Sequence, residues 1–100
     1  MIILAGTFTI DPARIDAYEA AVADMLPDVR AEQGCHHFST LVEDRAAGLV
    51  NVLEIWEDDA ALQVHMGQPW YRAIAERFGA SMSAFEVKLY DVAGVRPLAV

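Results

Sequence analysis

Apolar side chains recur at every second position near the N-terminus. This period of two predicts a β-strand over residues 2–10, with large apolar side chains sharing one face at Ile2, Leu4, Phe8 and Ile10. Further strands are predicted over residues 35–43, 49–57 and 85–92. Because the turn-forming stretch Asp44 to Gly48 separates the two middle strands, they are expected to form a hairpin.

Between the strands, the apolar positions change to helical spacing. Asp11 can cap a helix and Pro12 suits its first position. The helix carries an apolar stripe made of Ile15, Tyr18, Val22, Met25, Leu26 and Val29. Pro27 is expected to kink or break it near its C-terminal third, and Gly34 to end it.

A second helical region follows the hairpin. Asp58 and Asp59 are candidate N-caps for a short helix that carries Leu62, His65 and Met66, and Gly67 and Pro69 interrupt the pattern. A further helical piece is expected to place one side chain per turn on its apolar side, namely Trp70, Ile74, Phe78 and Met82.

The predicted order strand–helix–strand–strand–helix–strand is typical of a ferredoxin-like α+β fold. Its sheet has four antiparallel strands, and both helices lie on one face. The first and third strands are apolar on both faces, although a sheet face in contact with water would be polar. We therefore expect a second copy to cover the free face in a homodimer; the alternative is a monomer with scattered exposed apolar residues.

Composition supports this picture. The chain has 100 residues, of which 55% are hydrophobic, and we expect one domain over residues 1–93 and a tail over 94–100. A formal charge of −8 argues against nucleic acid and anionic membranes as partners. A single cysteine excludes an internal disulfide and fits the cytoplasm, and no apolar run is long enough for a membrane span.

The candidate chemistry lies between the third strand and the helix after it. Glu54 and Trp56 share one strand face, while Leu62 and His65 lie three residues apart on the helix. A carboxylate, an indole N–H and an imidazole can then meet beside apolar walls. Each of the three polar groups also has a purely structural interpretation, in packing or in hydrogen bonding.

A metal site is not expected. Cys35 and His37 share a predicted strand face, but His36 points the other way, and two ligands make a poor zinc site. The sequence also offers no partner that would make Cys35 a nucleophile.

The stretch from Glu54 to His65 has the pattern E-x-W-x-[DS]-x-x-A-L-x-x-H, and Gly34-Cys35 precedes the second strand. In these features the chain resembles the antibiotic biosynthesis monooxygenase domain, which includes small quinol monooxygenases. The resemblance implies a dimer in which two sheets pack into an α/β barrel. It also implies oxidation of a small aromatic quinol or polyphenol by O2, with no metal, flavin or other cofactor.

The resemblance suggests roles for individual residues. Trp56 would position the aromatic substrate, His65 would assist proton transfer and Glu54 would support His65. The expected walls of the substrate pocket are Leu62, Trp70 and Phe78, with Phe8, Tyr18 and Tyr71 as further candidates.

The sequence also departs from the family's patterns. Some members use an Asn four residues before the tryptophan and a Tyr six residues after it, where this chain has Val52 and Leu62. The haem-degrading branch uses an Asn on the first strand and a His on the last long helix, and this chain has neither. Two alternatives therefore stay open: a non-catalytic dimeric domain that binds a small ligand, and an isomerase of a small carbonyl compound.

Overall fold

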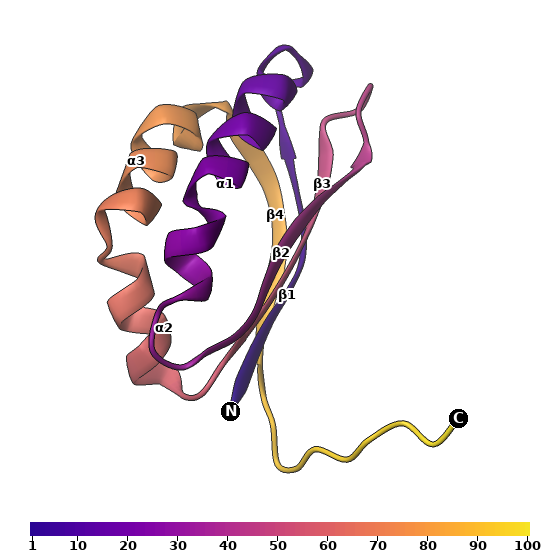
Figure 1. Cartoon of the computed structure of the whole chain (residues 1–100). Helices are drawn as coiled ribbons and strands as arrows, with labels where there is room; N and C mark the ends of the chain where they lie inside the picture. The colour runs from indigo at the N-terminus through magenta and orange to yellow at the C-terminus, as the bar shows by residue number, and fades with distance from the viewer.

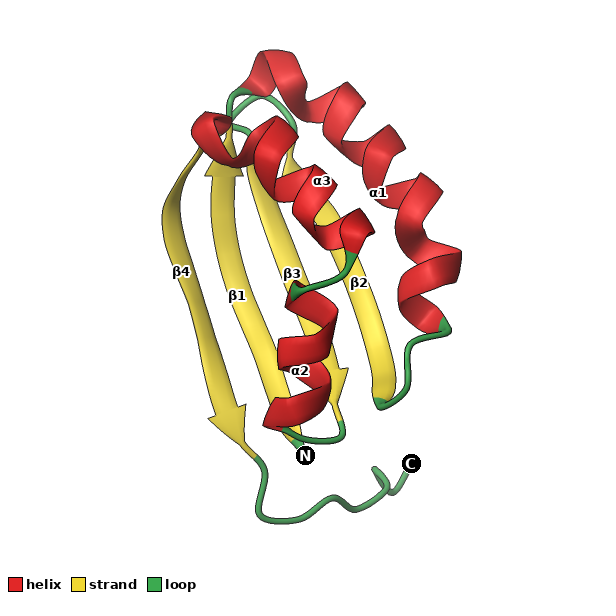
Figure 2. Ribbon diagram, turned by 90° about the vertical axis from the view of Figure 1, so that its left-hand side faces the viewer, coloured by secondary structure: helices red, strands yellow, loops and turns green.

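The computed structural model describes all 100 residues and has one four-stranded sheet. The strands are β1 (Ile2–Ile10), β2 (Cys35–Asp44), β3 (Leu49–Trp56) and β4 (Met82–Asp91). All neighbouring pairs are antiparallel, and the order across the sheet is β2-β3-β1-β4. Helices α1 (Ile15–Arg30), α2 (Asp59–Met66) and α3 (Pro69–Phe78) lie on one face (Figures 1 and 2). The predicted ferredoxin-like βαββαβ fold is confirmed.

The first helix begins as the sequence predicts. The Asp11 side chain accepts a hydrogen bond from the backbone N–H of Ala13 at 3.0 Å, and Pro12 opens a short 3₁₀ turn that leads into α1. The helix continues through Pro27 to Arg30, so the predicted break at that proline is wrong. The buried side chains of α1, which include Tyr18, Val22 and Val29, face the sheet and form the centre of the core.

The second helical region is divided as predicted. The Asp58 side chain accepts a hydrogen bond from the backbone N–H of Ala61 at 2.9 Å, which caps α2. Helix α2 ends at Gly67, and α3 restarts at Pro69.

The boundary between α3 and β4 differs from the prediction. Met82 does not continue the helix, because a 3₁₀ turn at Gly79–Ser81 ends it and Met82 pairs with Ile10 as the first residue of β4. The strand therefore starts three residues before the predicted Phe85. A residue with positive φ, Ala84, lies where the register between β1 and β4 shifts.

The two faces of the sheet differ in cover. The helix side carries buried side chains such as Phe38, Val50 and Trp56. On the open side, Leu41 is 66% exposed and Leu53 37% exposed. The segment after β4 swings toward this open side in Figure 1. None of the helices combines the length and the apolar character needed to span a membrane.

Candidate active site

A half-open cavity of about 330 Å³ lies between the sheet and the helices; we call it the inner cavity. Side chains from all four strands and all three helices line it, and most of them are apolar. Three methionines, Met25, Met66 and Met82, are part of this wall. The ionisable side chains of the wall are Tyr18, Glu54, His65 and Tyr71, and neither Lys nor Arg is among them. The cavity is therefore suited to a small apolar molecule without negative charge.

His65 is buried in α2, with 1% of its side chain exposed, and one of its nitrogens is tightly held. Its Nδ1 atom lies 2.7 Å from Oε2 of Glu32, and the indole N–H of Trp70 donates to the same oxygen at 3.2 Å. Oε2 of Glu32 accepts from Trp70, and a carboxylate oxygen also accepts from Nδ1–H, so Nδ1 carries a proton. Nε2 is buried and has no hydrogen-bond partner; when the imidazole is neutral, this nitrogen has a free lone pair.

Glu54 is the second buried carboxyl group of the site. Its Oε1 atom accepts a hydrogen bond from the indole N–H of Trp56 at 3.0 Å and lies 3.9 Å from Nε2 of His65. Burial raises the pKa of Glu54, although the bond from Trp56 and the nearby His65 oppose this and Glu32 adds to it. The raised pKa favours the protonated carboxyl group, which can donate a hydrogen bond into the cavity.

Aromatic rings surround the imidazole. The ring centroid of His65 lies 4.6 Å from that of Trp56, 5.2 Å from Tyr71 and 5.6 Å from Phe38. Trp56 is fully buried and does not line the inner cavity. Trp56 donates a hydrogen bond to Glu54 and packs against the ring of His65, so it supports the site without lining the cavity.

The other predicted wall residues fall into two groups. Leu62 lines the cavity, as do the further candidates Phe8, Tyr18 and Tyr71, whereas Trp70 and Phe78 do not. Phe78 is fully buried in the core, and the guanidinium groups of Arg14 and Arg77 lie 4.7 and 4.8 Å from the centroid of its ring. Trp70 contributes its hydrogen bond to Glu32 instead.

Tyr18 is the polar residue that α1 contributes to the wall. Burial raises its pKa to about 12, while a hydrogen bond with Thr40 opposes this shift and the charge of Glu54 adds to it. The phenol therefore stays neutral over the physiological range and can donate to or accept from a ligand oxygen.

Glu32 was missed by the sequence analysis. It lies in the loop between α1 and β2, where no periodic pattern assigns a direction to its side chain. Gly34, two residues later, explains why this loop reaches the site: it has a φ of +82°, and a Cβ atom there would lie 2.8 Å from Cβ of Ala61 in α2. The close approach of the loop to α2 brings Glu32 to His65. The only sequence signal was the nearby glycine, which was expected to end the helix; that prediction is wrong, because α1 already ends at Arg30 with Ala31 as its C-cap.

The Cys35-His36-His37 stretch contains an irregularity in the ladder. Cys35 pairs with Trp56 and His37 with Ile55, and a register shift falls between them. This places Cys35 and His37 on opposite faces, so the predicted shared face is wrong. Burial also raises the pKa of the Cys35 thiol, which makes it a poorer nucleophile. No three His, Cys, Asp or Glu side chains group in a way that could hold a metal ion.

Comparison with known proteins shows the family and the fold of the chain. The family model described as "antibiotic biosynthesis monooxygenase" matches residues 1–77. The chain belongs to this family. A family protein from Deinococcus radiodurans has a crystal structure that superposes with a TM-score of 0.82 at 15% identity, covering 100% of both chains.

A second antibiotic biosynthesis monooxygenase family structure, from Caulobacter crescentus, gives a TM-score of 0.80 at 23% identity, covering 93% of this chain and 90% of that one. In sequence, an uncharacterized protein of Synechocystis sp. is 24% identical over 98 residues, which are 97% of this chain and 67% of that protein. At these identities the two structures establish the fold, while the family model establishes membership.

Proposed function

We propose that this family member is a cofactor-independent monooxygenase that oxidises a small neutral aromatic, such as a quinol or polyphenol, with O2. The observation that carries the proposal is the state of His65. Its Nδ1 atom is held by Glu32, while its unpartnered Nε2 lies beside a mostly apolar cavity. A positioned imidazole with a free lone pair is a suitable general base near neutral pH.

The first step is the loss of a proton from a substrate hydroxyl group to Nε2 of His65. The resulting phenolate reduces O2 far more readily than the neutral phenol does. Burial raises the pKa of Glu54, and in its protonated form this carboxyl group can donate a hydrogen bond to a substrate oxygen. The mostly apolar walls reduce the contact of the reacting pair with other polar groups.

The overall reaction balances without an added reductant. A dihydroxyarene and O2 give a hydroxyquinone and water: one oxygen atom enters the ring, and the other leaves with two hydrogens of the substrate. The aromatic supplies all four electrons. The size of the cavity, near the lower end of the range of roughly 300–1,000 Å³ for ligand sites, favours substrates of one or two rings.

Oxygen uptake with a panel of hydroquinones and naphthols tests this proposal, with ¹⁸O2 to trace one labelled atom into the product. His65→Ala is expected to lower kcat by about 10²–10⁴-fold, the usual contribution of a general base. Trp56→Phe, which removes the hydrogen bond to Glu54, is expected to have a smaller effect. Gln63→Ala, on an exposed position of α2, is the control and should match wild type. Absence of uptake with every substrate, or a fully active His65→Ala, would refute the proposal.

One observation favours a different function. Val52 and Leu62 both line the cavity, at the positions where some family members have an Asn and a Tyr, and neither can form a side-chain hydrogen bond. The second candidate is therefore a non-catalytic domain that binds a small apolar ligand. Recovery of a bound naphthol unchanged after aerobic incubation supports it, whereas oxidised product excludes it.

A further inference from the structure

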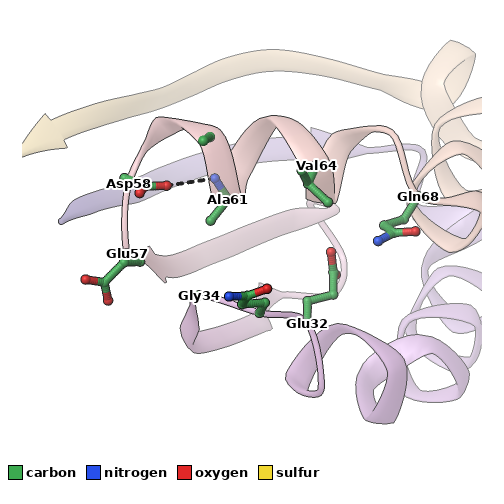
Figure 3. A pocket seen from close by; sticks show the side chains of 9 residues that line it. Glu32, Gly34, Glu57, Asp58, Ala61, Val64 and Gln68 are labelled. Carbon is green, nitrogen blue, oxygen red and sulfur yellow. Dashed lines mark hydrogen bonds between the residues drawn. The ribbon is translucent and has the colours of Figure 1, made fainter.

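A second cavity, of about 420 Å³, lies on the other side of Glu32; we call it the outer hollow. Its wall is formed by the loop after α1, the start of α2 and Gln68. Figure 3 shows the Glu32 side chain rising from that loop toward α2, with its carboxylate beside Val64 and Gln68. His65 lines the inner cavity but not the outer hollow, and Glu32 lines the outer hollow but not the inner cavity. The pair therefore spans the wall between the two spaces.

Two buried polar atoms have no hydrogen-bond partner, and they are the two ends of this pair. One is Nε2 of His65 and the other is Oε1 of Glu32, whose side chain is only 5% exposed. The atoms between them are closely linked, with Nδ1 of His65 2.7 Å from Oε2 of Glu32. Buried polar groups are normally paired. An unpaired atom at each end of the hydrogen-bonded His65–Glu32 pair therefore indicates that each end exchanges protons with a molecule outside the pair.

We propose that Glu32 is a proton relay that carries the proton taken up by His65 from the inner cavity to water in the outer hollow. The proposal rests on the function of His65 as a base. Glu32 acts through His65 and does not reach the substrate, so it is a positioning and relay residue.

The relay has three balanced steps. Nε2 of His65 accepts the substrate proton and forms an imidazolium. Nδ1 then passes its own proton to Oε2 of Glu32, which leaves His65 neutral with the proton on Nε2. The protonated carboxyl group turns by half a revolution, so that its two oxygens exchange places and the O–H faces the outer hollow, where water removes the proton. The relay then resets in the opposite direction: as product formation takes the proton from Nε2, Nδ1 takes a proton back from Oε2 of Glu32, which receives it from water in the outer hollow, so the cycle neither gains nor loses a proton.

Other routes out of the inner cavity are less suitable. Aromatic rings of Trp56, Phe38 and Tyr71 surround the imidazole. Glu54 accepts a hydrogen bond from Trp56 and does not line the outer hollow, so it offers no route to that space. Trp70 donates to the same oxygen as His65, whereas Oε1 is buried and has no hydrogen-bond partner.

A purely structural role for Glu32 makes a different prediction. Glu32→Gln keeps an oxygen that accepts from both Nδ1–H and Trp70, but an amide does not carry a proton between them. If Glu32 only orients His65, this variant behaves like wild type. If Glu32 is a relay, the geometry is preserved and proton passage is lost.

The first measurement needs no substrate. In protein labelled with ¹⁵N-histidine, NMR reports the tautomer of His65 and the rate at which its Nδ1 proton exchanges with water at fixed pH. Glu32→Gln is expected to keep the tautomer and to slow exchange by about 10²-fold or more, the lower end of the usual general-base contributions. Val64→Phe, which fills the outer hollow and leaves Glu32 intact, is also expected to slow exchange. Gln63→Phe, on an exposed neighbouring position, is the control and should not.

The second measurement uses turnover. Glu32→Gln is expected to lower kcat with little change in KM, and Glu32→Ala is expected to regain activity when formate or acetate is added, to an extent that follows the pKa of the added acid. Unchanged exchange in both Glu32→Gln and Val64→Phe overturns the relay, even if quinols are oxidised. Slowed exchange in a protein that oxidises nothing supports the relay and refutes the oxidation proposal, so the two failures are distinguishable.

Discussion

Glu32 and Glu54 approach different nitrogens of His65, and the two contacts differ in kind. Glu32 forms a direct hydrogen bond to Nδ1 at 2.7 Å, whereas Glu54 stays 3.9 Å from Nε2 and accepts from Trp56 instead. A molecule that enters the cavity can therefore compete for Nε2 without breaking a hydrogen bond of His65. Because Glu54 is buried, the protonation of its carboxyl group should change the stability of the fold with pH.

Glu54→Gln is expected to make stability less sensitive to pH. The pKa of Glu54 is raised in the native state from its ordinary value of 4.5, mainly by burial. Its contribution to stability is thus fully present below about pH 4.5 and is lost as the pH rises through the raised pKa. Glutamine can still accept from Trp56 and never ionises. The Tm of the variant minus that of wild type should therefore increase with pH over this window and then level off. A difference in Tm that is constant across the window would contradict the assignment.

For single residues, the sequence predicted side-chain directions that follow from the period of a strand or a helix. Strand parity placed Glu54 and Trp56 on one face, and helical spacing placed Leu62 and His65 on one side of α2; all four meet near the inner cavity. Glu32 and the role of Trp70 could not be predicted in this way, because a loop residue has no period and its partner is 33 residues away. The proposed functions of these side chains stay predictions.

Helix α2 is the element on which the base depends. It has eight residues, which is too short to be stable in isolation, so its cap and its packing hold it in place. The Asp58 side chain supplies the cap through its bond to the N–H of Ala61. The loop at Gly34 supplies the packing on the side of Ala61.

Asp58→Ala is expected to lower the free energy of unfolding by about 1 kcal/mol, the usual cost of a lost N-cap, as measured by urea denaturation. Because α2 carries His65, backbone amides of this helix should also exchange faster with D2O, and the NMR signal of the His65 Nδ1 proton should broaden. Asp11→Ala, which removes the corresponding contact before α1, is the matched control: stability falls, but the His65 signal stays sharp. A sharp His65 signal in Asp58→Ala would show that packing alone fixes α2.

The boundaries of α2 were predictable because Asp58 caps its start and Gly67 its end, whereas α1 ends before the predicted Gly34. Predictions also failed where two patterns overlap. The spacing Trp70, Ile74, Phe78, Met82 continues a helical stripe, yet pairing with Ile10 draws Met82 into β4. At Pro27, tertiary packing of the buried α1 stripe outweighs the local effect of proline. In both cases the deciding contact is distant in sequence.

The whole molecule has one sheet face that its own helices do not cover. Leu41, Leu53 and Tyr90 are exposed on that face, at 66%, 37% and 51%. The apolar character of both faces of β1 and β3 was visible in the sequence. The sequence did not show what covers the open face, because the pattern of one chain does not specify how a second chain packs against it. We propose that a second copy packs there, as is typical of the antibiotic biosynthesis monooxygenase family.

Light scattering is expected to give twice the mass of the chain for wild type. Leu53→Lys places a charge on the central strand β3 of the open face, where burial against a partner is costly, and should shift the protein toward the monomer. Val64→Lys, an exposed apolar position on α2 away from that face, is the matched control and should remain dimeric. A wild-type monomer, or a Leu53→Lys variant as dimeric as wild type, would contradict packing through this face.

The three methionines in the wall of the inner cavity should limit how long the protein stays active. Thioethers are readily converted to sulfoxides, which are polar and disturb apolar packing. Under the proposed chemistry, Met25, Met66 and Met82 stand next to oxygen that is being reduced, whereas Met1 lies at the chain terminus outside the cavity. Each turnover that releases a partly reduced oxygen species can therefore oxidise a methionine in the cavity wall. The sulfoxide content of these three side chains, measured by mass spectrometry and compared with that of Met1, should therefore rise with the number of turnovers.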